Sequence, residues 1–203
     1  MIKIIGSLTS PFTRIVRVVS EELRIPYEFE VTAPFGKLDE SQVRLISSHN
    51  PLMKIPILID GSTEVLDSRI IVHYLLRQNK QQSDFRADFP RSPLEDNVLT
   101  VIYGIMDAGV LRFMLRASHP EIDSDIGYMS RSYNRIGHGL GWLENEPVLG
   151  QSFGVTEAAL ICGLEWFRKR DVYRWSAFPR ISKVYDMYCE RQSLAKTRIP
   201  ESV

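Results

Sequence analysis

Three short segments in the first third of the chain carry groups that can bind an anionic or peptide-like ligand. The first is Ser10-Pro11, which separates a short β-rich run from an apolar helical pattern. Serine is a preferred N-cap and proline is favoured at the first helical position, so the pair predicts a strand-to-helix turn. The unpaired N–H groups and the dipole of that helix N-terminus would stabilise an anion, with the Ser10 hydroxyl as a further donor. Taken alone, however, the pair is more simply a helix cap.

The other two segments are Lys54-Ile55-Pro56 and Asp67-Ser68. Proline cannot serve a central ladder, so Pro56 is expected at the first residue of a strand or at an edge. A cis bond before Pro56 would turn the Ile55 backbone N–H and C=O outward, where a peptide-like ligand could pair with them. The simpler alternative is an ordinary strand-start proline, because only ~5–6% of X–Pro bonds are cis. Asp67-Ser68 is either a helix cap or a carboxylate site at a helix N-terminus.

The elements that position Ser10-Pro11 form a βαβ unit. A buried strand is predicted over 2–6, a helix from Pro11 to near Arg24, and a second strand over 27–31. Pro26 blocks continuation of the helix. Strand, helix and strand within about 30 residues predict parallel strands with a right-handed crossover.

The other two segments fall in a ββα unit. A short helix is predicted over 39–46, followed by strands over 57–59 and 63–66. The intervening Asp60-Gly61-Ser62 carries the Asp-Gly hairpin signal. A further helix opens at Asp67-Ser68. This order predicts a four-stranded mixed sheet with helices on its faces.

The second half of the chain contains helical patterns and no strand pair. We therefore expect an α/β domain over 1–79, a polar linker over 80–92 and an all-helical domain over 93–203. The helices of the second domain are predicted over 94–116, 123–144, 155–167 and 181–189. The third of these patterns is the most apolar, which predicts a central buried helix.

Composition excludes several classes of function. The 25 lysines and arginines balance 25 aspartates and glutamates, so there is no basic excess to favour nucleic-acid or membrane-surface binding. Cys162, Cys189 and the four histidines show no metal-ligand spacing, and no metal is expected. No stretch of ~18 apolar residues that could span a membrane is expected, and the apolar N-terminus is too short for a signal peptide. A cytoplasmic location is expected.

Together the three segments resemble the glutathione S-transferase family. Their order and spacing match it, and the resemblance extends to the start of the predicted central helix and to a segment near the C-terminus. The closest likeness is to the short bacterial type with a serine before the proline. The matching segments are Ser10-Pro11-Phe12, residues 50–58, residues 66–71, residues 155–160 and residues 190–193.

The resemblance implies a thioredoxin-like N-terminal domain, an all-α C-terminal domain and a homodimer. It also implies glutathione as co-substrate. Ser10 would then donate a hydrogen bond to the glutathione sulfur, with Thr9 and Phe12 as possible accessory residues. The implied glutathione-binding residues are Ile55 and a cis Pro56 for the cysteinyl backbone, Asp67 and Ser68 for the γ-glutamyl end, and Lys54 for the glycyl carboxylate.

The implied activity is glutathione transfer to a small hydrophobic electrophile. A free thiol has a pKa of ~8.5, and a hydroxyl donor together with a helix N-terminus lowers it. The electrophile would lie against the long helix after the linker. Candidate wall residues there are Tyr103, Met106, Asp107 and Val110.

The chain departs from related patterns at five positions. Ser10 and Thr13 occupy the two cysteine positions of redox members of the thioredoxin-like group, which excludes dithiol exchange at this turn. Met53 stands where a glycine is usual. Gly154 and Glu157 stand for the usual Ser/Thr and Asp of the box that caps the central helix, which predicts a weaker box.

Two alternatives to a transferase remain open. The same scaffold serves non-catalytic, partner-binding proteins, although the three intact segments argue against that use here. It also serves specialised lyases, isomerases or dehalogenases that use glutathione. The substrate pocket of this last group lies in the variable helical domain, so the sequence does not separate these enzymes from transferases.

Overall fold

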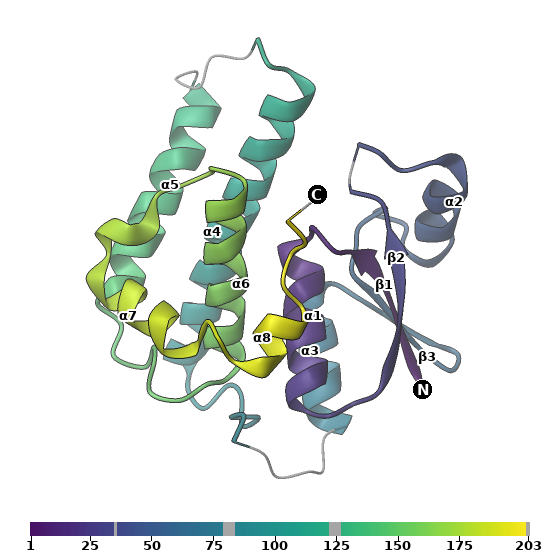
Figure 1. Ribbon diagram of the computed structural model, residues 1–203, viewed down its shortest axis with the longest axis horizontal. Helices are drawn as coiled ribbons and strands as arrows, with labels where there is room; N and C mark the ends of the chain where they lie inside the picture. The colour runs from purple at the N-terminus through teal and green to yellow at the C-terminus, as the bar shows by residue number, and fades with distance from the viewer. Residues whose placement is uncertain (35, 79–83, 122–126, 202–203) are drawn as a thin grey trace. The chain divides into compact units, whose positions relative to one another are not determined.

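The protein forms two units, which Figure 1 shows as a ribbon. This computed structural model describes residues 1–34, 36–78, 84–121 and 127–201. The first unit comprises Met1–Asp88 together with the C-terminal segment from Arg191, and the second comprises Phe89–Glu190. The division expected from sequence gave that C-terminal segment to the helical domain, whereas the structure groups it with the first unit.

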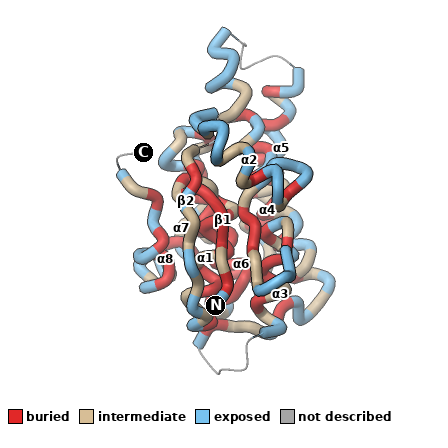
Figure 2. The backbone as a smooth tube through the Cα atoms, turned by 90° about the vertical axis from the view of Figure 1, so that its right-hand side faces the viewer, coloured by how far each residue is buried: buried red, intermediate tan, exposed pale blue. Residues whose placement is uncertain are grey.

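The first unit is built on a four-stranded mixed sheet with the order β2-β1-β3-β4. Strand β1 (Ile2–Ser7) pairs in parallel with β2 (Tyr27–Thr32), as a βαβ unit requires. Strands β3 (Ile57–Asp60) and β4 (Thr63–Leu66) form the predicted antiparallel hairpin, and β3 pairs antiparallel with β1. Strand β1 is buried over most of its length (Figure 2).

Helices α1 (Pro11–Glu22) and α3 (Ser68–Gln78) pack together on one face of this sheet (Figure 1). The close approach of α1 to β1 depends on Gly6. A Cβ atom at Gly6 would lie 2.5 Å from Cγ2 of Thr13, well inside van der Waals contact. Glycine at this strand position therefore lets the helix lie directly on the sheet.

Helix α2 (Glu40–His49) lies on the other face of the sheet (Figure 1). Its N-cap is Asp39, whose side chain accepts a hydrogen bond from the backbone N–H of the third helical residue. Ile46 of α2 packs in a buried cluster with Ile5 and Ile57 of the sheet. Because helices cover both faces of the sheet, the sequences of its central strands are nearly continuous apolar runs.

The second unit contains four α-helices within its described residues: α4 (Pro93–Ser118), α5 (Gly127–Glu144), α6 (Val155–Lys169) and α7 (Pro179–Tyr188). A single 3-10 turn precedes α7. The first thirteen residues of α6 are all buried, which confirms the predicted central helix. The predicted start of the second helix lies outside the described residues.

Two glycines set how closely the helices of this unit pack. A Cβ atom at Gly109 of α4 would lie 2.5 Å from Cε1 of Phe167, whose ring is fully buried in α6. At Gly139 of α5, an added Cβ would overlap the side chain of Ile105 of α4. Glycine lowers helix propensity, but at these positions it permits contacts that a side chain would block.

Helix α4 is long and apolar enough to cross a membrane by length and composition. The sequence was not expected to contain such a stretch. Half of that apolar window is buried inside the protein, where α4 packs against α5 and α6. The apolar character of α4 is thus accounted for by helix packing, because a helix between two others needs more than one apolar face.

The cap of α6 is carried by Glu157 rather than by the N-cap residue. Gly154 has no side chain to bond the first-turn N–H groups. The fully buried Glu157 carboxylate accepts hydrogen bonds from the N–H of Gly154 (3.1 Å), the N–H of Gly150 (2.9 Å) and the hydroxyl of Thr156 (2.8 Å). The box therefore lacks its N-cap side chain, while its carboxylate accepts from two donors besides the Gly154 N–H.

The C-terminal segment lies along α1 and was not predicted to do so. It contains the one-turn helix α8 (Gln192–Lys196), which lies beside α1 (Figure 1). Arg191 donates two hydrogen bonds to the Glu22 carboxylate, at 2.6 and 2.8 Å, and the hydroxyl of Ser193 donates a third. The buried Arg14 guanidinium donates to the Leu194 carbonyl at 3.1 Å. Hydrogen bonding to Glu22 also raises the pKa of Arg191.

Two glycines of α4 test the packing argument. Gly109→Ala is expected to lower the free energy of unfolding by about 1–3 kcal/mol, because the new methyl group overlaps the buried Phe167 ring. Gly104→Ala, on the same helix, meets nothing within 4 Å and is expected to raise it by about 0.5–1 kcal/mol through helix propensity. Denaturant unfolding of both variants measures the difference. Equal effects would contradict the close-packing role of Gly109.

Neighbouring glutamates of α1 test the C-terminal segment. Glu22→Gln is expected to cost about 2 kcal/mol, because it removes a paired charge whose side chain is only 7% exposed. Glu21→Gln is the control: its pair with Lys196 is more exposed, and its loss should cost under about 1 kcal/mol. Denaturant unfolding gives both values. Similar costs would show that the Arg191 contact does not hold the segment in place.

Candidate functional site

The register of the sheet brings the three ligand-binding segments to one end of the first unit. Ile5 of β1 lies opposite Ile57 of β3, and Ile57 lies opposite Leu66 of β4. The C-terminal end of β1, the residues before β3 and the residues after β4 therefore adjoin one another across three neighbouring strands. The turn at Ser10 follows the first, Pro56 precedes the second and Ser68 follows the third.

The β1–α1 turn presents the Ser10 side chain at the start of α1. The Ser10 backbone N–H donates to the Ser7 carbonyl at 3.1 Å, and the Ser10 hydroxyl oxygen accepts from the Thr13 N–H at 3.2 Å. Ser10 is half-buried. Its hydroxyl hydrogen makes no hydrogen bond with any residue that the structure describes. The cap thus engages the oxygen and leaves the hydrogen available to a ligand.

Thr9 and Phe12 flank Ser10 in this turn. Thr9 is 8% exposed, and Phe12 is half-buried in the first turn of α1. The Thr9 hydroxyl lies 3.0 Å from the Ser7 hydroxyl, and the Thr9 N–H donates to that same Ser7 oxygen at 3.3 Å. Ser7 was not singled out from the sequence, although a serine at the end of a strand before a turn is a position where such local bonds are common.

The segment before β3 has the geometry that the family resemblance implied. The Ile55–Pro56 peptide bond is cis. Ile55 is half-buried, and its backbone N–H and C=O form no hydrogen bond within the described residues. The buried Asn50 shapes the loop: its Nδ2 donates to the Lys54 carbonyl at 2.7 Å, and its Oδ1 accepts from the Leu52 N–H at 3.0 Å. The Lys54 side chain is exposed.

Two residues of the site have left-handed backbone conformations. Met53 has φ of +52° and Asp67 has φ of +70°. Such conformations cost a non-glycine residue on the order of 1–3 kcal/mol and cluster at functional sites. A glycine, which is usual at position 53 in the family that the sequence resembles, would adopt this conformation without that cost. The presence of methionine there therefore makes the backbone conformation of the loop more costly.

The start of α3 combines a cap with an unused hydroxyl. One oxygen of the exposed Asp67 carboxylate accepts the Arg69 N–H at 2.9 Å. Ser68 is 4% exposed, and its hydroxyl has no hydrogen-bond partner among the described residues. The dipole of α3 adds a partial positive charge at this point. This end of the sheet therefore presents both hydrogen-bond donors and acceptors that the described residues leave unused.

The four residues predicted to line an electrophile pocket all lie on α4. Tyr103 and Met106 are buried, and Met106 packs against α6, where a Cβ atom at Gly163 would lie 2.9 Å from its Cγ. The contact of these two buried residues with a substrate stays a prediction. Val110 is half-buried and Asp107 is exposed, and their contact with a substrate stays a prediction.

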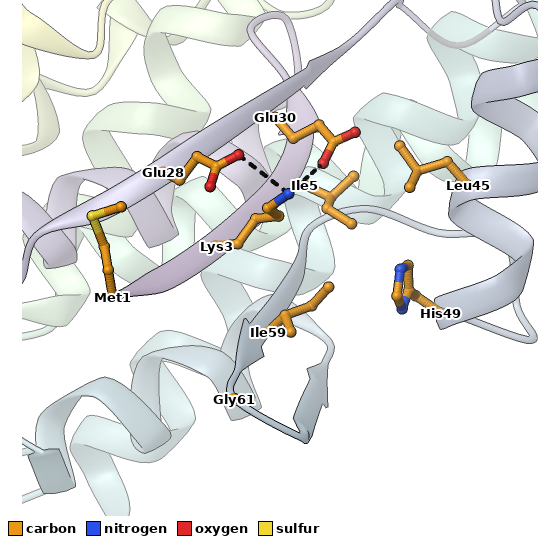
Figure 3. A pocket seen from close by; sticks show the side chains of 9 residues that line it. All are labelled: Met1, Lys3, Ile5, Glu28, Glu30, Leu45, His49, Ile59 and Gly61. Atoms are coloured by element: carbon orange, nitrogen blue, oxygen red, sulfur yellow. Dashed lines mark hydrogen bonds and ion pairs between the residues drawn. The ribbon is translucent and has the colours of Figure 1, made fainter.

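A separate hollow of about 470 Å³ lies on the α2 face of the sheet, at the opposite end of β1 (Figure 3). Lys3 points into it and forms ion pairs with Glu30 at 3.1 Å and Glu28 at 3.2 Å. The hydrogen bond to Glu30, followed by that to Glu28, contributes most to raising the pKa of Lys3. The cation is thus already matched by two carboxylates, and the hollow shares no residue with the three segments.

Known proteins resemble this chain over nearly its full length. The glutathione S-transferase N-terminal domain model matches residues 4–83. The uncharacterized GST-like protein YibF of Escherichia coli (strain K12) is 28% identical over 98% of this chain and 100% of its own. A crystal structure of glutathione S-transferase from Methylobacillus flagellatus KT with GSH bound has a TM-score of 0.83 at 25% identity, covering 98% of this chain and 100% of that one. A glutathione transferase family member from Pseudomonas fluorescens Pf-5 with bound glutathione has the same fold, with a TM-score of 0.80 at 24% identity and the same coverage.

A βαβαββα thioredoxin-like unit followed by a helical unit defines the glutathione S-transferase fold, as expected from the sequence. Residues 4–83 match the glutathione S-transferase N-terminal domain, and the chain is similar to proteins of that family over nearly its full length.

Proposed function

We propose that this protein binds glutathione at the end of the sheet and activates its thiol for attack on a small hydrophobic electrophile. One observation carries the proposal. The Ser10 hydroxyl hydrogen, the Ile55 backbone groups and the Ser68 hydroxyl lie at one end of three adjoining strands, and none has a hydrogen-bond partner among the described residues.

The size of this array fits a tripeptide. Neighbouring strands are about 4.8 Å apart, so the ends of β1 and β4 are about 10 Å apart with β3 between them. An extended tripeptide spans about 10 Å. The thiol would meet Ser10 beyond β1, the cysteinyl backbone would pair with Ile55 beside β3, and the γ-glutamyl end would reach Ser68 at α3. The exposed Lys54 would meet the glycyl carboxylate.

The proposed chemistry is stabilisation of a thiolate. A free thiol with a pKa of ~8.5 is mostly protonated at neutral pH. The Ser10 hydroxyl and the N-terminus of α1 both favour the charged form, so the pKa of the bound thiol falls and more thiolate is available to attack carbon. The sulfur belongs to the ligand, because Ser10 and Thr13 supply hydroxyls where redox relatives carry thiols.

The identity of the electrophile depends on the helical unit, and a specialised lyase, isomerase or dehalogenase would use the same thiolate. A non-catalytic partner-binding role is the alternative of another class. Isothermal titration calorimetry with glutathione separates this role from the enzymatic ones. A protein that does not bind glutathione at millimolar concentration would favour the partner-binding role. The homodimer and the cytoplasmic location implied by the family stay predictions.

Ser10→Ala tests the thiolate role. Loss of a hydrogen bond to a charged sulfur is expected to lower kcat/KM with a model electrophile by about 10- to 100-fold, with a smaller change in glutathione affinity. Ser10→Thr, which keeps the hydroxyl and the cap, should retain most of the activity. Conjugation rates across several electrophiles measure the effect. A wild-type rate no faster than buffer for every electrophile would refute the transferase activity.

Ser68→Ala tests the glutathione-binding role of the α3 N-terminus. Removal of one hydroxyl from the γ-glutamyl site is expected to weaken glutathione binding by about 5- to 15-fold without changing the pKa of the bound thiol. Ser62→Ala is the control, because Ser62 is an exposed residue in the β3–β4 turn at the other end of the hairpin. Calorimetry gives both affinities. Equal affinities in the two variants would remove Ser68 from the site.

A further inference from the structure

Asn50, the residue that caps the C-terminal end of α2, bonds to three backbone groups of the loop that leads to Pro56. Its side-chain oxygen accepts the Leu52 N–H at 3.0 Å, and its backbone carbonyl accepts the Met53 N–H at 2.9 Å. Its side-chain nitrogen donates to the Lys54 carbonyl at 2.7 Å. Asn50 is 3% exposed, so water competes little for these bonds. One buried residue therefore fixes the backbone on both sides of Met53.

The amide of Asn50 suits this role because it carries an acceptor and a donor on one short planar group. Its two partners also settle which way the amide is turned. The Leu52 N–H can only donate and the Lys54 carbonyl can only accept, so the oxygen faces the first and the nitrogen the second. Between these partners lies Met53, whose left-handed backbone is unfavourable for a residue with a side chain. The bonds of Asn50 offset that cost and hold the loop in one conformation.

The bond from Asn50 to Lys54 sets the direction of the next N–H group along the chain. The peptide bond between Lys54 and Ile55 is not among the cis bonds of the described chain, so this planar unit is trans. In a planar trans unit the C=O and the N–H point in opposite directions. The Lys54 carbonyl points at the buried Asn50 amide, so the Ile55 N–H points away from it. That N–H has no hydrogen-bond partner among the described residues.

We propose that Asn50 is a positioning residue that aims the Ile55 N–H at the cysteinyl carbonyl of glutathione. The inference rests on the proposed glutathione function. A donor whose direction is already fixed loses no conformational freedom when the ligand binds, whereas a donor that must first be ordered weakens binding. A carbonyl that accepts a hydrogen bond also polarises its own peptide unit, so the bond from Asn50 makes the Ile55 N–H a stronger donor. Asn50 thus acts on the ligand through Lys54 without touching it.

The test follows the Ile55 amide by nuclear magnetic resonance in protein labelled with ¹⁵N-isoleucine, where Ile55→Val identifies the signal by its loss. Glutathione is expected to move the Ile55 amide proton of the wild type downfield, because a new hydrogen bond forms to it. Asn50→Ala should reduce this shift and weaken glutathione binding by about 5- to 15-fold in calorimetry, since one hydrogen bond is misaligned. At saturating glutathione its kcat should change by less than about 2-fold, because the contact of the thiol with Ser10 is kept.

Asn50→Asp isolates the bond to Lys54. It keeps the size of the side chain and the oxygen that accepts the Leu52 N–H, but it replaces the donor to the Lys54 carbonyl by an acceptor. It should weaken glutathione binding at least as much as Asn50→Ala and likewise reduce the Ile55 shift. Binding and an Ile55 shift equal to those of the wild type would show that the bond to Lys54 does not aim the N–H, and would overturn the inference.

Ile46→Val is the matched control. Ile46 lies one turn before Asn50 on α2, and its side chain belongs to the buried cluster with Ile5 and Ile57. The substitution removes one buried methylene group and should lower stability, while the bonds of Asn50 remain. It should leave both the Ile55 shift and glutathione binding unchanged. An Asn50 that served the fold alone would behave in the same way, and that result in Asn50→Ala would overturn the inference.

The outcomes separate the inference from the function beneath it. A wild type that does not bind glutathione would overturn both. A wild type that binds glutathione without moving the Ile55 amide proton would overturn the Asn50 role and leave activation of the thiol standing. If Asn50→Ala does not fold, Asn50→Asp decides by the same two measurements.

Discussion

The site depends on the pairing register of β1, β3 and β4. Side chains alternate between the two faces of a strand, so a slip by one residue would exchange the faces of every residue in β1. Such a slip would turn Lys3 away from Glu28 and Glu30 and toward α1, where a charge is costly to bury. It would also turn Gly6 away from Thr13, where only glycine fits. These two residues therefore help fix the end of β1 beside Pro56.

Helix α1 is held at both ends by parts of the chain that lie far apart in the sequence. Its N-terminus receives the turn from β1, and its C-terminus binds Arg191 through Glu22. Between them, the buried Arg14 holds the Leu194 carbonyl. A helix N-terminus can favour a thiolate only if its N–H groups keep their direction, and these contacts fix α1 against the sheet. The C-terminal segment thus contributes to the site without being part of it.

Most of the fold could be predicted from the sequence because its signals are local. Helix caps such as Ser10 and Asp39, the Asp-Gly turn and the apolar periodicity all report the conformation of the residues that carry them. Helix α8 could not be predicted, because five residues are too few to form a stable helix alone and its contacts come from α1. The left-handed backbone at Met53 was hidden for a related reason: its residue type does not encode that conformation, which the surrounding loop imposes.

The residue types at the Ser10 turn determine which reactions it can support. The serine and threonine at the positions of the redox cysteines supply no thiol, and Thr13 is fully buried beneath the turn. The two cysteines of the chain lie elsewhere, Cys162 within α6 and Cys189 at the end of α7. Hydroxyls remain neutral at physiological pH and can act as hydrogen-bond donors. Under the proposed function, the reactive sulfur would therefore have to come from the ligand, and hydroxyls of the turn would act on it only as hydrogen-bond donors.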